Sequence, residues 1–403
     1  MKRFLCIVLC VLTVFSVYET AVCAQKSVRW GTPKKRVNAD AYMLVSLNDE
    51  VHTVVASENA DKKKYPASLT KIVTAMVVLN NTKNIRKKTT VHQSALDTIA
   101  GTGAQSAGLR AGDTLTVEQL LYLAIVFSAC DACQVLAQTV AGSVPQFVKM
   151  MNAWVKKIGC SHSHFVNPEG LHHENQYTTA FDMRLIALKA IENKTFLKIA
   201  QTVSYTYKGT VFAHTSKILH SKYKAYYYPY AKGIKTGYTK QAGRCLVTIA
   251  EKKGYRYLAV LLDAPLHVKD RALYNTAYFD AKNLFEWAFG RFRLQKIRLD
   301  TYPAGTVPLK DAKRKNSLFL ISREEKTVLL PIGANPQDSV IQPVKKPKAI
   351  YAPIRQGDSI CEAVLNYDGV AVARTRLIAG ETAELSRFSR AVRHIWEWLR
   401  GKR

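Results

Sequence analysis

The sequence predicts an α+β fold, in which a large domain of helices and an antiparallel sheet precedes a small all-β domain and a terminal amphipathic helix. Helical apolar periods dominate residues 65–192, and strand-like runs follow one another closely at residues 230–262. After Arg291 the apolar runs are short and β-like, and residues 385–403 return to a helical period. At 403 residues the chain is long enough for two domains.

The first residues differ from the rest and predict export. Lys2 and Arg3 precede an apolar run from Phe4 to Tyr18, and small residues follow up to Ala24. This run is shorter than the roughly 20 residues that a transmembrane helix needs. An uncleaved anchor and lipidation at Cys23 are the alternatives. We therefore assign the chain as follows: signal peptide 1–24, catalytic domain 25–292, all-β domain 293–384 and amphipathic anchor helix 385–403.

Composition limits the class of protein and of partner. The chain is 48% hydrophobic and 22% charged, as in ordinary globular proteins, and its net charge is +29. Such an excess suits anionic partners such as lipid headgroups, cell-wall polymers or nucleic acid, and export argues against nucleic acid. Three of the eight cysteines precede residue 25. The remaining five are too sparse, and odd in number, to form a disulfide framework.

The large domain is expected to begin with a hairpin and to continue with helices. Ala41–Ser46 and Val51–Ala56 are its candidate strands, and Ser46-Leu-Asn48 belongs to the turn. The glycine-rich residues 100–113 predict a loop. Helices are expected at residues 66–79, 116–127, 148–158, 181–192 and 277–289, with one more ending near Gly142; strands are expected at residues 230–237, 244–250 and 257–262.

The C-terminal part combines β signals with a basic helix. Asp368-Gly369 between two apolar runs is a strong two-residue hairpin signal. Apolar residues then recur at helical spacing, and arginines occupy much of the remaining surface. A basic, Trp-bearing amphipathic helix favours attachment to an anionic membrane surface, and docking on the β domain is the alternative. The expected strands are 318–321, 327–330, 350–352, 361–367 and 370–377, and the expected apolar face is Phe388, Val392, Ile395, Trp396 and Leu399.

A candidate nucleophile stands at the start of the first long helix. In Tyr65-Pro-Ala-Ser68-Leu-Thr-Lys71 the spacing places Ser68 and Lys71 one helical turn apart on the same face. A lysine amine in a partly desolvated pocket acts as a base toward a serine hydroxyl at neutral pH. The same Ser-x-x-Lys pattern recurs at Ser221 and Lys224 without an apolar helix behind it, so only the first copy is a candidate site.

Two further segments complete a catalytic set. Ser128 follows the first pair by sixty residues, and Lys235-Thr236-Gly237 lies on an expected strand. The histidine-rich stretch 162–173 is a conceivable zinc site, but its spacing matches neither a helical histidine pair nor a zinc finger. A hydrogen-bonded loop is the better interpretation of that stretch, and the set as a whole requires no metal or cofactor.

These motifs resemble those of the low-molecular-mass penicillin-binding proteins that act as D-alanyl-D-alanine carboxypeptidases. The segments YPASLTKIVTAMVVL, FVNPEGLHHENQYTTAFDM and GIKTGYTKQAGRCLV are similar to that family's, and the resemblance spans essentially the whole mature chain. It implies a β-lactamase/penicillin-binding-like catalytic fold and removal of the terminal D-alanine from peptidoglycan stem pentapeptides. It also implies inhibition by β-lactams and a location in the periplasm or on the outer face of the cytoplasmic membrane.

The resemblance assigns roles by position. Ser68 would attack the carbonyl between the two terminal D-alanines and form an acyl-enzyme, Lys71 would accept its proton, and Ser128 would pass a proton to the departing amine. Lys235-Thr236-Gly237 would bind the substrate, with the lysine charge and the threonine hydroxyl on its terminal carboxylate. The backbone N–H groups of Ser68 and Tyr238 would form the oxyanion hole.

Cys130 occupies the position of the family's asparagine, where it would contact the substrate. A thiol donates and accepts hydrogen bonds only weakly, so we expect a loss of about 1–3 kcal/mol, or roughly 5- to 150-fold in rate. Cys130-Asp-Ala-Cys133 also has the spacing of a redox pair at a helix start. A disulfide between these cysteines and two free thiols are the alternatives.

Two other functions remain open from the sequence. A β-lactamase needs a second base for deacylation, and Glu169 lies in a suitable region, although its neighbours match the carboxypeptidase segment. A non-catalytic wall-binding protein would explain Cys130, but not the retention of Ser68, Lys71, Ser128 and Lys235.

Overall fold

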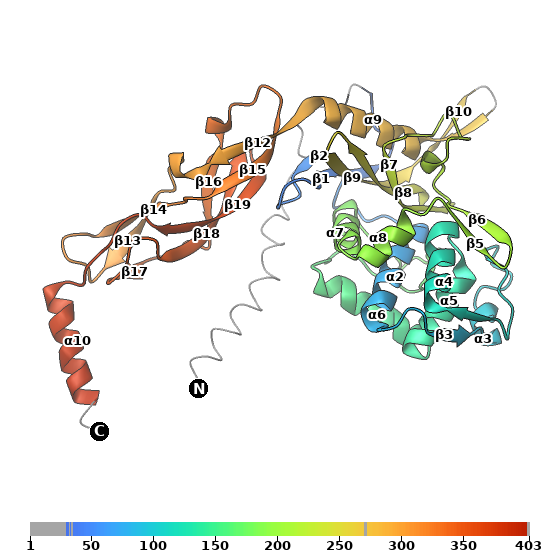
Figure 1. Ribbon diagram of the computed structural model, residues 1–403, viewed down its shortest axis with the longest axis horizontal. Coiled ribbons are helices and arrows are strands. Elements are labelled where there is room, and N and C mark those ends of the chain that lie inside the picture. Colours follow the sequence, from blue (N-terminus) through green and yellow to red (C-terminus); the bar gives the residue numbers. More distant parts are fainter. Residues whose placement is uncertain (1–29, 32, 34, 270–271, 401–403) are drawn as a thin grey trace. The chain divides into compact units, whose positions relative to one another are not determined.

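The structure, a computed structural model, describes residues 30, 31, 33, 35–269 and 272–400 (Figure 1). The predicted signal peptide lies outside these residues. The described chain divides into two compact units. The first contains the residues up to Val45 together with Val54–Gly290, and the second contains Ser46–Thr53 and the residues from Arg291 onward. The predicted α+β class, with an all-β region at the C-terminal side, is confirmed.

A five-stranded antiparallel sheet forms the framework of the first unit. Its strand order is β2-β1-β9-β8-β7, so the first two strands of the chain join the last three of the unit. In β8 and β9, unbroken runs of buried side chains face helices on both sides of the sheet. The strands are β1 (Ala41–Ser46), β2 (Val54–Glu58), β7 (Ala231–Thr239), β8 (Gly243–Lys252) and β9 (Tyr255–Ala264).

Helices cover both faces of this sheet (Figure 1). One face carries α9, and the other carries a cluster in which α7 packs against β9 and α8 against β7. The helices of the first unit are α2 (Thr70–Asn81), α3 (Gln93–Asp97), α4 (Val117–Tyr122), α5 (Cys130–Ala141), α6 (Val144–Lys157), α7 (Ala180–Ile191), α8 (Lys194–Ala200) and α9 (Thr276–Arg291). Short hairpins are β3 (Lys88–Thr90) with β4 (Thr114–Thr116), β5 (Ser204–Tyr207) with β6 (Thr210–Ala213), and β10 (Leu266–Lys269) with β11 (Ala272–Asn275).

The helix α2 is the centre of the helical cluster. Every residue from Thr70 to Val78 is buried, and the helix contacts α5, α6 and α7. A helix that is apolar all round is stable only when it is enclosed by others. The sequence TKIVTAMVVL therefore places the residues at its N-terminus at a fixed position inside the domain.

The second unit consists mainly of strands. A six-stranded sheet has the order β16-β18-β19-β14-β13-β17, and β12 pairs with β15. Asp368 and Gly369 both have positive φ and link Tyr367 to Val370, as the two-residue hairpin signal predicts. The strands are β12 (Phe292–Arg298), β13 (Thr306–Lys310), β14 (Ser317–Ile321), β15 (Glu325–Pro331), β16 (Val340–Val344), β17 (Ile350–Tyr351), β18 (Ser359–Tyr367) and β19 (Val370–Ala379).

The first hairpin departs from the prediction at its second strand. The carboxylate of Asp49 accepts hydrogen bonds from Thr53 N at 2.8 Å and from Thr53 Oγ1 at 3.0 Å. This holds residues 49–53 in a turn, so β2 begins at Val54 rather than at Val51. Asn48 N donates to Ser46 Oγ at 3.1 Å, which confirms that Ser46-Leu-Asn48 belongs to turn chemistry.

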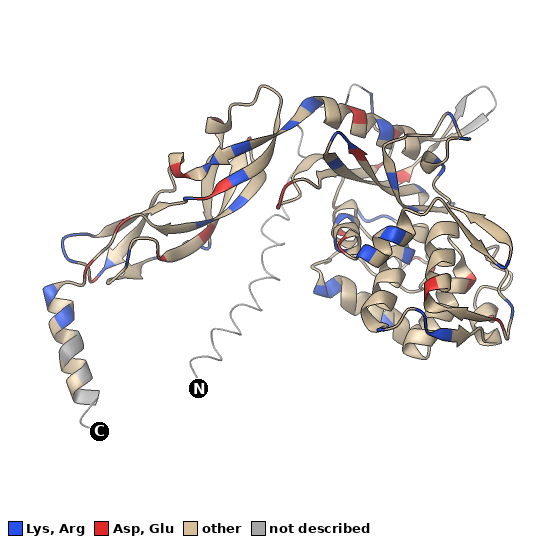
Figure 2. Ribbon diagram, in the orientation of Figure 1, with Lys and Arg blue, Asp and Glu red and all other residues tan. Residues whose placement is uncertain are grey.

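The terminal helix α10 spans Arg387–Arg400. Its apolar side chains are largely exposed, with Phe388 79%, Ile395 57% and Trp396 60% accessible. The side chain of Leu399, predicted on the same face, lies outside the described part. Among the described residues, none of the helices combines the length and the apolar character that a membrane crossing requires. Lysines and arginines are spread over many elements rather than gathered on one (Figure 2).

Candidate active site

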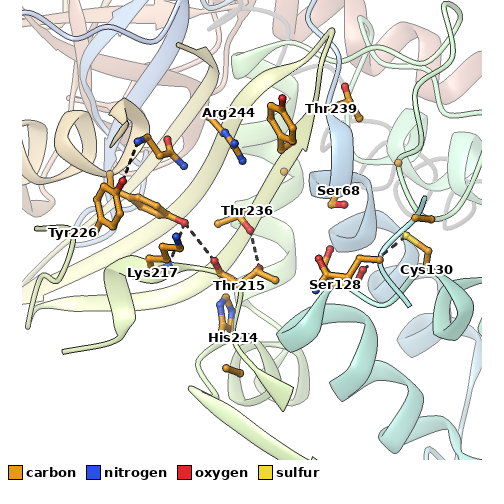
Figure 3. A pocket seen from close by; sticks show the side chains of 18 of the residues that line it. Ser68, Ser128, Cys130, His214, Thr215, Lys217, Tyr226, Thr236, Thr239 and Arg244 are labelled. Atoms are coloured by element: carbon orange, nitrogen blue, oxygen red, sulfur yellow. Dashed lines mark hydrogen bonds between the residues drawn. The ribbon is translucent and has the colours of Figure 1, made fainter. Parts of the chain in front are cut away.

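Ser68 lies in a short 3₁₀ turn, Ala67–Leu69, that leads directly into α2. Lys71 Nζ donates to Ser68 Oγ at 3.0 Å, the contact that the one-turn spacing predicts. Ser68 is half-buried, whereas Lys71 is fully buried. Ser68, which lines the pocket in Figure 3, is therefore open to a substrate, while its buried lysine partner is shielded from water.

The amine of Lys71 has two further neighbours. It donates to the main-chain oxygen of Glu169 at 2.6 Å, and Cys130 Sγ lies 3.4 Å away. The Glu169 carboxyl group itself accepts a hydrogen bond from Gln134 Nε2 at 2.7 Å. These contacts hold Nζ beside Ser68 without an ion pair to a carboxylate.

The proton affinity of Lys71 depends on the charges around it. Burial lowers the pKa of the Lys71 amine, whereas negative charge on Cys130, Cys133 or Glu169 raises it above its usual value. Burial also raises the pKa of the Cys133 thiol far above neutrality and that of the Glu169 carboxyl to about 7. At neutral pH the Cys133 thiol therefore adds no charge and Glu169 only part of one, and Cys130 is the neighbour that opposes the effect of burial on Lys71 most.

The second buried amine, that of Lys235, also affects how readily Lys71 holds a proton. Lys235 is fully buried, and its pKa is lowered well below the usual value by burial and by the neighbouring charge of Lys71. A proton on either lysine disfavours a proton on the other. Two protons on this pair are therefore less favourable than one, and the pKa of Lys235 is the lower of the two.

Glu169→Gln is expected to move the acid limb of the acylation rate to lower pH. Acylation requires a neutral Lys71, so its rate rises with pH through the pKa of that amine. The glutamine keeps an oxygen for Gln134 but removes the negative charge that raises the pKa of Lys71, so the pKa falls. Penicillin acylation measured between pH 5 and 9 tests this. The exposed Glu174→Gln is the control, and an unshifted limb in Glu169→Gln would contradict the coupling.

Ser128 is held in an unusual backbone conformation beside this pair. It ends a π-helical turn, Leu123–Phe127, and has φ +69°, in the left-handed region that non-glycine residues seldom adopt. Cys130 follows as the first residue of α5, where its N–H donates to Gln105 O at 2.7 Å. Such distortions persist where the surroundings enforce them, and they are frequent at functional sites.

Asp131 fixes the loop in front of Ser128. Its buried carboxylate accepts hydrogen bonds from Ser106 Oγ at 2.6 Å and from the N–H groups of Ala107 and Leu109 at 3.0 and 3.1 Å. The glycine-rich loop predicted at residues 100–113 is therefore tied to the start of α5. Cys130 and Cys133 are both buried and both free thiols.

Strand β7 forms the opposite wall of the site. Lys235 Nζ donates to Thr236 O at 3.0 Å, Thr236 is half-buried, and Gly237 lies against the turn that carries Ser68. A Cβ atom at Gly237 would come within 3.1 Å of Ser68 N, so glycine permits this close approach. Tyr238 is 50% exposed, and the Arg244 guanidinium lies over its ring at 3.6 Å from the centroid.

Sequence reasoning missed the segment His214-Thr215, which supports β7. Buried His214 accepts from Ser216 N at 3.0 Å through Nδ1, so its Nε2 donates to Ile234 O at 3.2 Å. Burial lowers the pKa of His214 to about 3, and the imidazole is therefore neutral. Thr215 Oγ1 lies 2.7 Å from Thr236 Oγ1. The available signal was a histidine and hydroxyl group directly after strand β6.

Neither of the two alternative motifs supplies a second catalytic centre, although the histidine-rich stretch reaches Lys71 through the main-chain oxygen of Glu169. The histidine-rich segment is a hydrogen-bonded loop, in which His164 Nδ1 contacts Asn175 O at 2.7 Å and Asn167 Oδ1 accepts from Gly170 N at 2.7 Å. Within the described residues, no group of three or more histidine, cysteine and acidic side chains could hold a metal ion. Ser221 and Lys224 are exposed.

One cavity of about 650 Å³ joins the predicted residues. Ser68, Ser128 and Cys130 line it on one side and Thr236, Gly237 and Tyr238 on the other (Figure 3). Lys71 and Lys235 lie buried behind these walls. The structure thus brings together around one cavity segments that are 167 residues apart between Ser68 and Lys235.

Comparison with known proteins gives consistent matches. The family model described as D-alanyl-D-alanine carboxypeptidase matches residues 27–266. D-alanyl-D-alanine carboxypeptidase DacF of Bacillus subtilis is 26% identical over 90% of this chain and 91% of its own length. DacA of Haemophilus influenzae is 27% identical over 93% and 92%.

Solved structures extend the similarity to the fold. Penicillin binding protein 5 from Haemophilus influenzae superimposes with a TM-score of 0.68 at 25% identity, covering 88% of this chain and 100% of that one. The Streptomyces K15 DD-transpeptidase has a TM-score of 0.57 at 28% identity and covers 64% of this chain and 100% of its own.

Proposed function

Because this chain belongs to the D-alanyl-D-alanine carboxypeptidase family of serine peptidases, we propose that Ser68 is the nucleophile with which it removes the terminal D-alanine from peptidoglycan stem pentapeptides. The observation that carries the assignment is the contact of Ser68 Oγ with the buried amine of Lys71 at 3.0 Å. Release of D-alanine from a peptide ending in D-Ala-D-Ala tests the function. A folded protein that released none and took up no penicillin would contradict it.

The first half of the reaction forms the acyl-enzyme. Neutral Lys71 takes the proton of Ser68, whose oxygen attacks the carbonyl carbon between the two terminal D-alanines. The N–H groups of Ser68 and Tyr238 stabilise the negative charge that develops on the carbonyl oxygen. The C–N bond breaks, and Ser128 relays a proton to the departing amine.

Substrate binding and deacylation complete the cycle. Lys235 and the hydroxyl of Thr236 bind the terminal carboxylate, with Gly237 allowing the strand to approach Ser68. Cys130 contributes only weak hydrogen bonds to the substrate. Water hydrolyses the ester at Ser68 and releases the shortened peptide. A penicillin mimics the substrate and leaves a slower acyl-enzyme on the same serine.

The two alternative functions are not favoured. A β-lactamase needs a carboxylate that activates water at the acyl-enzyme. Here the Glu169 carboxyl is 3% exposed, hydrogen-bonded to Gln134, and has a pKa raised by burial to about 7. A non-catalytic wall-binding protein has no use for a buried lysine held against an open serine.

We assign the catalytic domain to residues 25–292, the small all-β domain to 293–384 and a membrane anchor to 385–403, following export by the signal peptide. The anchor holds the enzyme at the outer face of the cytoplasmic membrane. Exposed Phe388, Ile395 and Trp396 on α10 support this assignment, because interfacial burial of such side chains is favourable. The exposed Arg387 and Arg390 add attraction to anionic lipid.

Truncation after Glu384 is expected to release active enzyme from the membrane fraction. It removes the apolar face and a basic contribution of about 1 kcal/mol per residue near anionic lipid, while the residues around Ser68 stay intact. Sedimentation with anionic vesicles and penicillin labelling measure the two effects. The variant Arg387→Gln with Arg390→Gln serves as a comparison, because it should weaken binding mainly at low salt. A truncated protein that still sediments would place the anchor elsewhere.

A further inference from the structure

The cavity continues past Thr236, away from Ser68. We call this extension the cationic arm and define it by Lys217, Lys222, Arg244, Tyr223, Tyr226 and Tyr278, all of which line the cavity. Figure 3 shows Lys217 and Tyr226 on one side of Thr236 and Ser68 on the other. The role proposed for Ser68 and Thr236 leaves this part of the cavity without a function.

A short series of contacts connects the nucleophile to the arm. Gly237 lies against Ser68, and the neighbouring Thr236 Oγ1 is 2.7 Å from Thr215 Oγ1. Tyr278 OH donates to Thr215 O at 3.4 Å and accepts from Lys217 N at 3.2 Å. Because Thr236 is proposed to bind the terminal carboxylate, the arm begins where a terminal D-alanine would end, within reach of the side chain of a larger leaving residue.

The positive charges of the arm are not balanced by carboxylates. Lys217 Nζ lies 4.9 Å from the Tyr223 ring centroid and 5.8 Å from that of Tyr226, and Lys222 Nζ lies 5.3 Å from that of Tyr223. In the described part of the chain neither lysine forms an ion pair with a carboxylate, in contrast to Lys64 and Lys252, which do.

Arg244 adds a third charge of the same kind. Its guanidinium stacks on Tyr238, and its Nε is buried and has no hydrogen-bond partner among the residues that the structure describes. Stacking on an aromatic face orients a cation but leaves its N–H groups available for an anion. A buried donor without a partner is costly, and a ligand that accepts its hydrogen bond recovers that cost. The described residues of the arm thus offer three cations and no acid.

We propose that the cationic arm binds an anionic group on the leaving residue, so that this enzyme prefers substrates whose last D-residue is larger than alanine and carries a second negative charge. The inference rests on the function proposed above. A cavity of about 650 Å³ is of the size that holds a whole drug-sized ligand, and two alanines fill only part of it.

The chemical step is unchanged by the larger leaving group. Ser68 forms its ester with the penultimate D-alanine, the amide C–N bond breaks, and the departing amine takes the proton relayed by Ser128. Water then hydrolyses the ester. Two substrates carry this leaving-group chemistry: a stem peptide ending in an acidic D-residue, and a cross-link in which the departing amine belongs to a second, anionic stem peptide.

Four peptides that share one acyl part and end in D-Ala-D-Glu, D-Ala-D-Gln, D-Ala-D-Lys or D-Ala-D-Ala test the proposal. We expect kcat/KM for an end of D-Ala-D-Glu to exceed that for D-Ala-D-Gln by about tenfold, the size of one charge-assisted hydrogen bond, and D-Ala-D-Lys to be the poorest. The preference should shrink as salt increases. In the double variant Lys217→Gln with Lys222→Gln, the Glu-to-Gln ratio should fall to about one.

Control variants distinguish a failure of the cationic-arm proposal from a failure of the proposed function. Lys240→Gln removes an exposed lysine between β7 and β8 that does not line the cavity, and should keep the preference. Penicillin labelling of each variant verifies an intact site. Equal rates for the Glu and Gln ends in the parent enzyme would overturn the proposed role of the cationic arm, and so would a preference that survives in the double variant. In either case, turnover of D-Ala-D-Ala would still uphold the proposed function. Absence of all turnover in a folded parent would overturn both.

A purified cross-linked muropeptide dimer distinguishes the two sources of the ligand. Cleavage of the dimer that is lost in the double variant supports the arm and identifies the cross-link as a substrate. An uncleaved dimer together with preferred D-Ala-D-Glu hydrolysis supports the arm for acidic terminal residues.

Discussion

Ser68→Ala is expected to abolish both the covalent uptake of penicillin and the release of D-alanine. The side-chain oxygen is the atom that forms the acyl-enzyme, and removal of the nucleophile from a serine peptidase costs on the order of a million-fold in kcat. The fold should persist, because Ser68 is half-buried and its loss leaves Lys71 hydrogen-bonded to Glu169 O at 2.6 Å. Labelled penicillin followed by gel electrophoresis, and a D-alanine assay, measure the two activities.

Ser221→Ala provides the matched control. It removes the serine of the second Ser-x-x-Lys pattern, which is exposed and lies outside the apolar helix. We expect parent levels of labelling and turnover in this variant. Labelling that survives in Ser68→Ala but disappears in Ser221→Ala would move the nucleophile to the second copy and contradict the mechanism derived from α2.

The fold class was predictable because its signals are local and periodic. The apolar run of α2, the continuous apolar runs of β8 and β9, and the Asp368-Gly369 hairpin each predict their structure from a few residues. Boundaries were less accurate where a side chain competes with the backbone. Asp49 caps the turn before β2 in this way and shortens the strand.

The catalytic residues were predictable in part. Ser68 and Lys71 are one helical turn apart, so their contact follows from helix geometry. Their meeting with Ser128 and Lys235 depends on how α2, α5 and β7 pack, and only the resemblance to a known family indicated it from the sequence.

Other parts of the site carried only a weak sequence signal. Contacts between His214 and Ile234, and between Thr215 and Thr236, join the segment after β6 to a strand twenty residues later. Neither residue type is diagnostic in isolation. The pKa of Lys71 likewise depends on burial and on neighbours such as Cys130 and Glu169, which lie 59 and 98 residues away in the chain and are brought there by packing.

Gly170 is another residue whose role depends on packing and not on a local sequence signal. After Ser68→Ala, its exchange for alanine should have the largest effect on acylation. It has φ +91°, and a Cβ there would lie 2.0 Å from Ala67 O and 2.9 Å from Ser68 N. Both atoms belong to the backbone of the turn that carries the nucleophile, so no side-chain rotation relieves the overlap. The turn or the loop must move by about an ångström, and a displacement of that size costs on the order of 100-fold in rate.

Gly112→Ala separates this overlap from backbone strain. Gly112 has nearly the same φ, +89°, but nothing lies within 4 Å of the position of its Cβ. Both variants carry the penalty of an L-residue in the left-handed region, about 1–2 kcal/mol, and Gly170→Ala should lose more thermal stability because of the overlap. Only Gly170→Ala should also lose penicillin acylation in protein that is still folded, because only there does the added methyl group displace Ser68 from Lys71. Equal acylation rates in the two folded variants would show that the loop yields without moving the nucleophile, and would remove Gly170 from the elements that position Ser68.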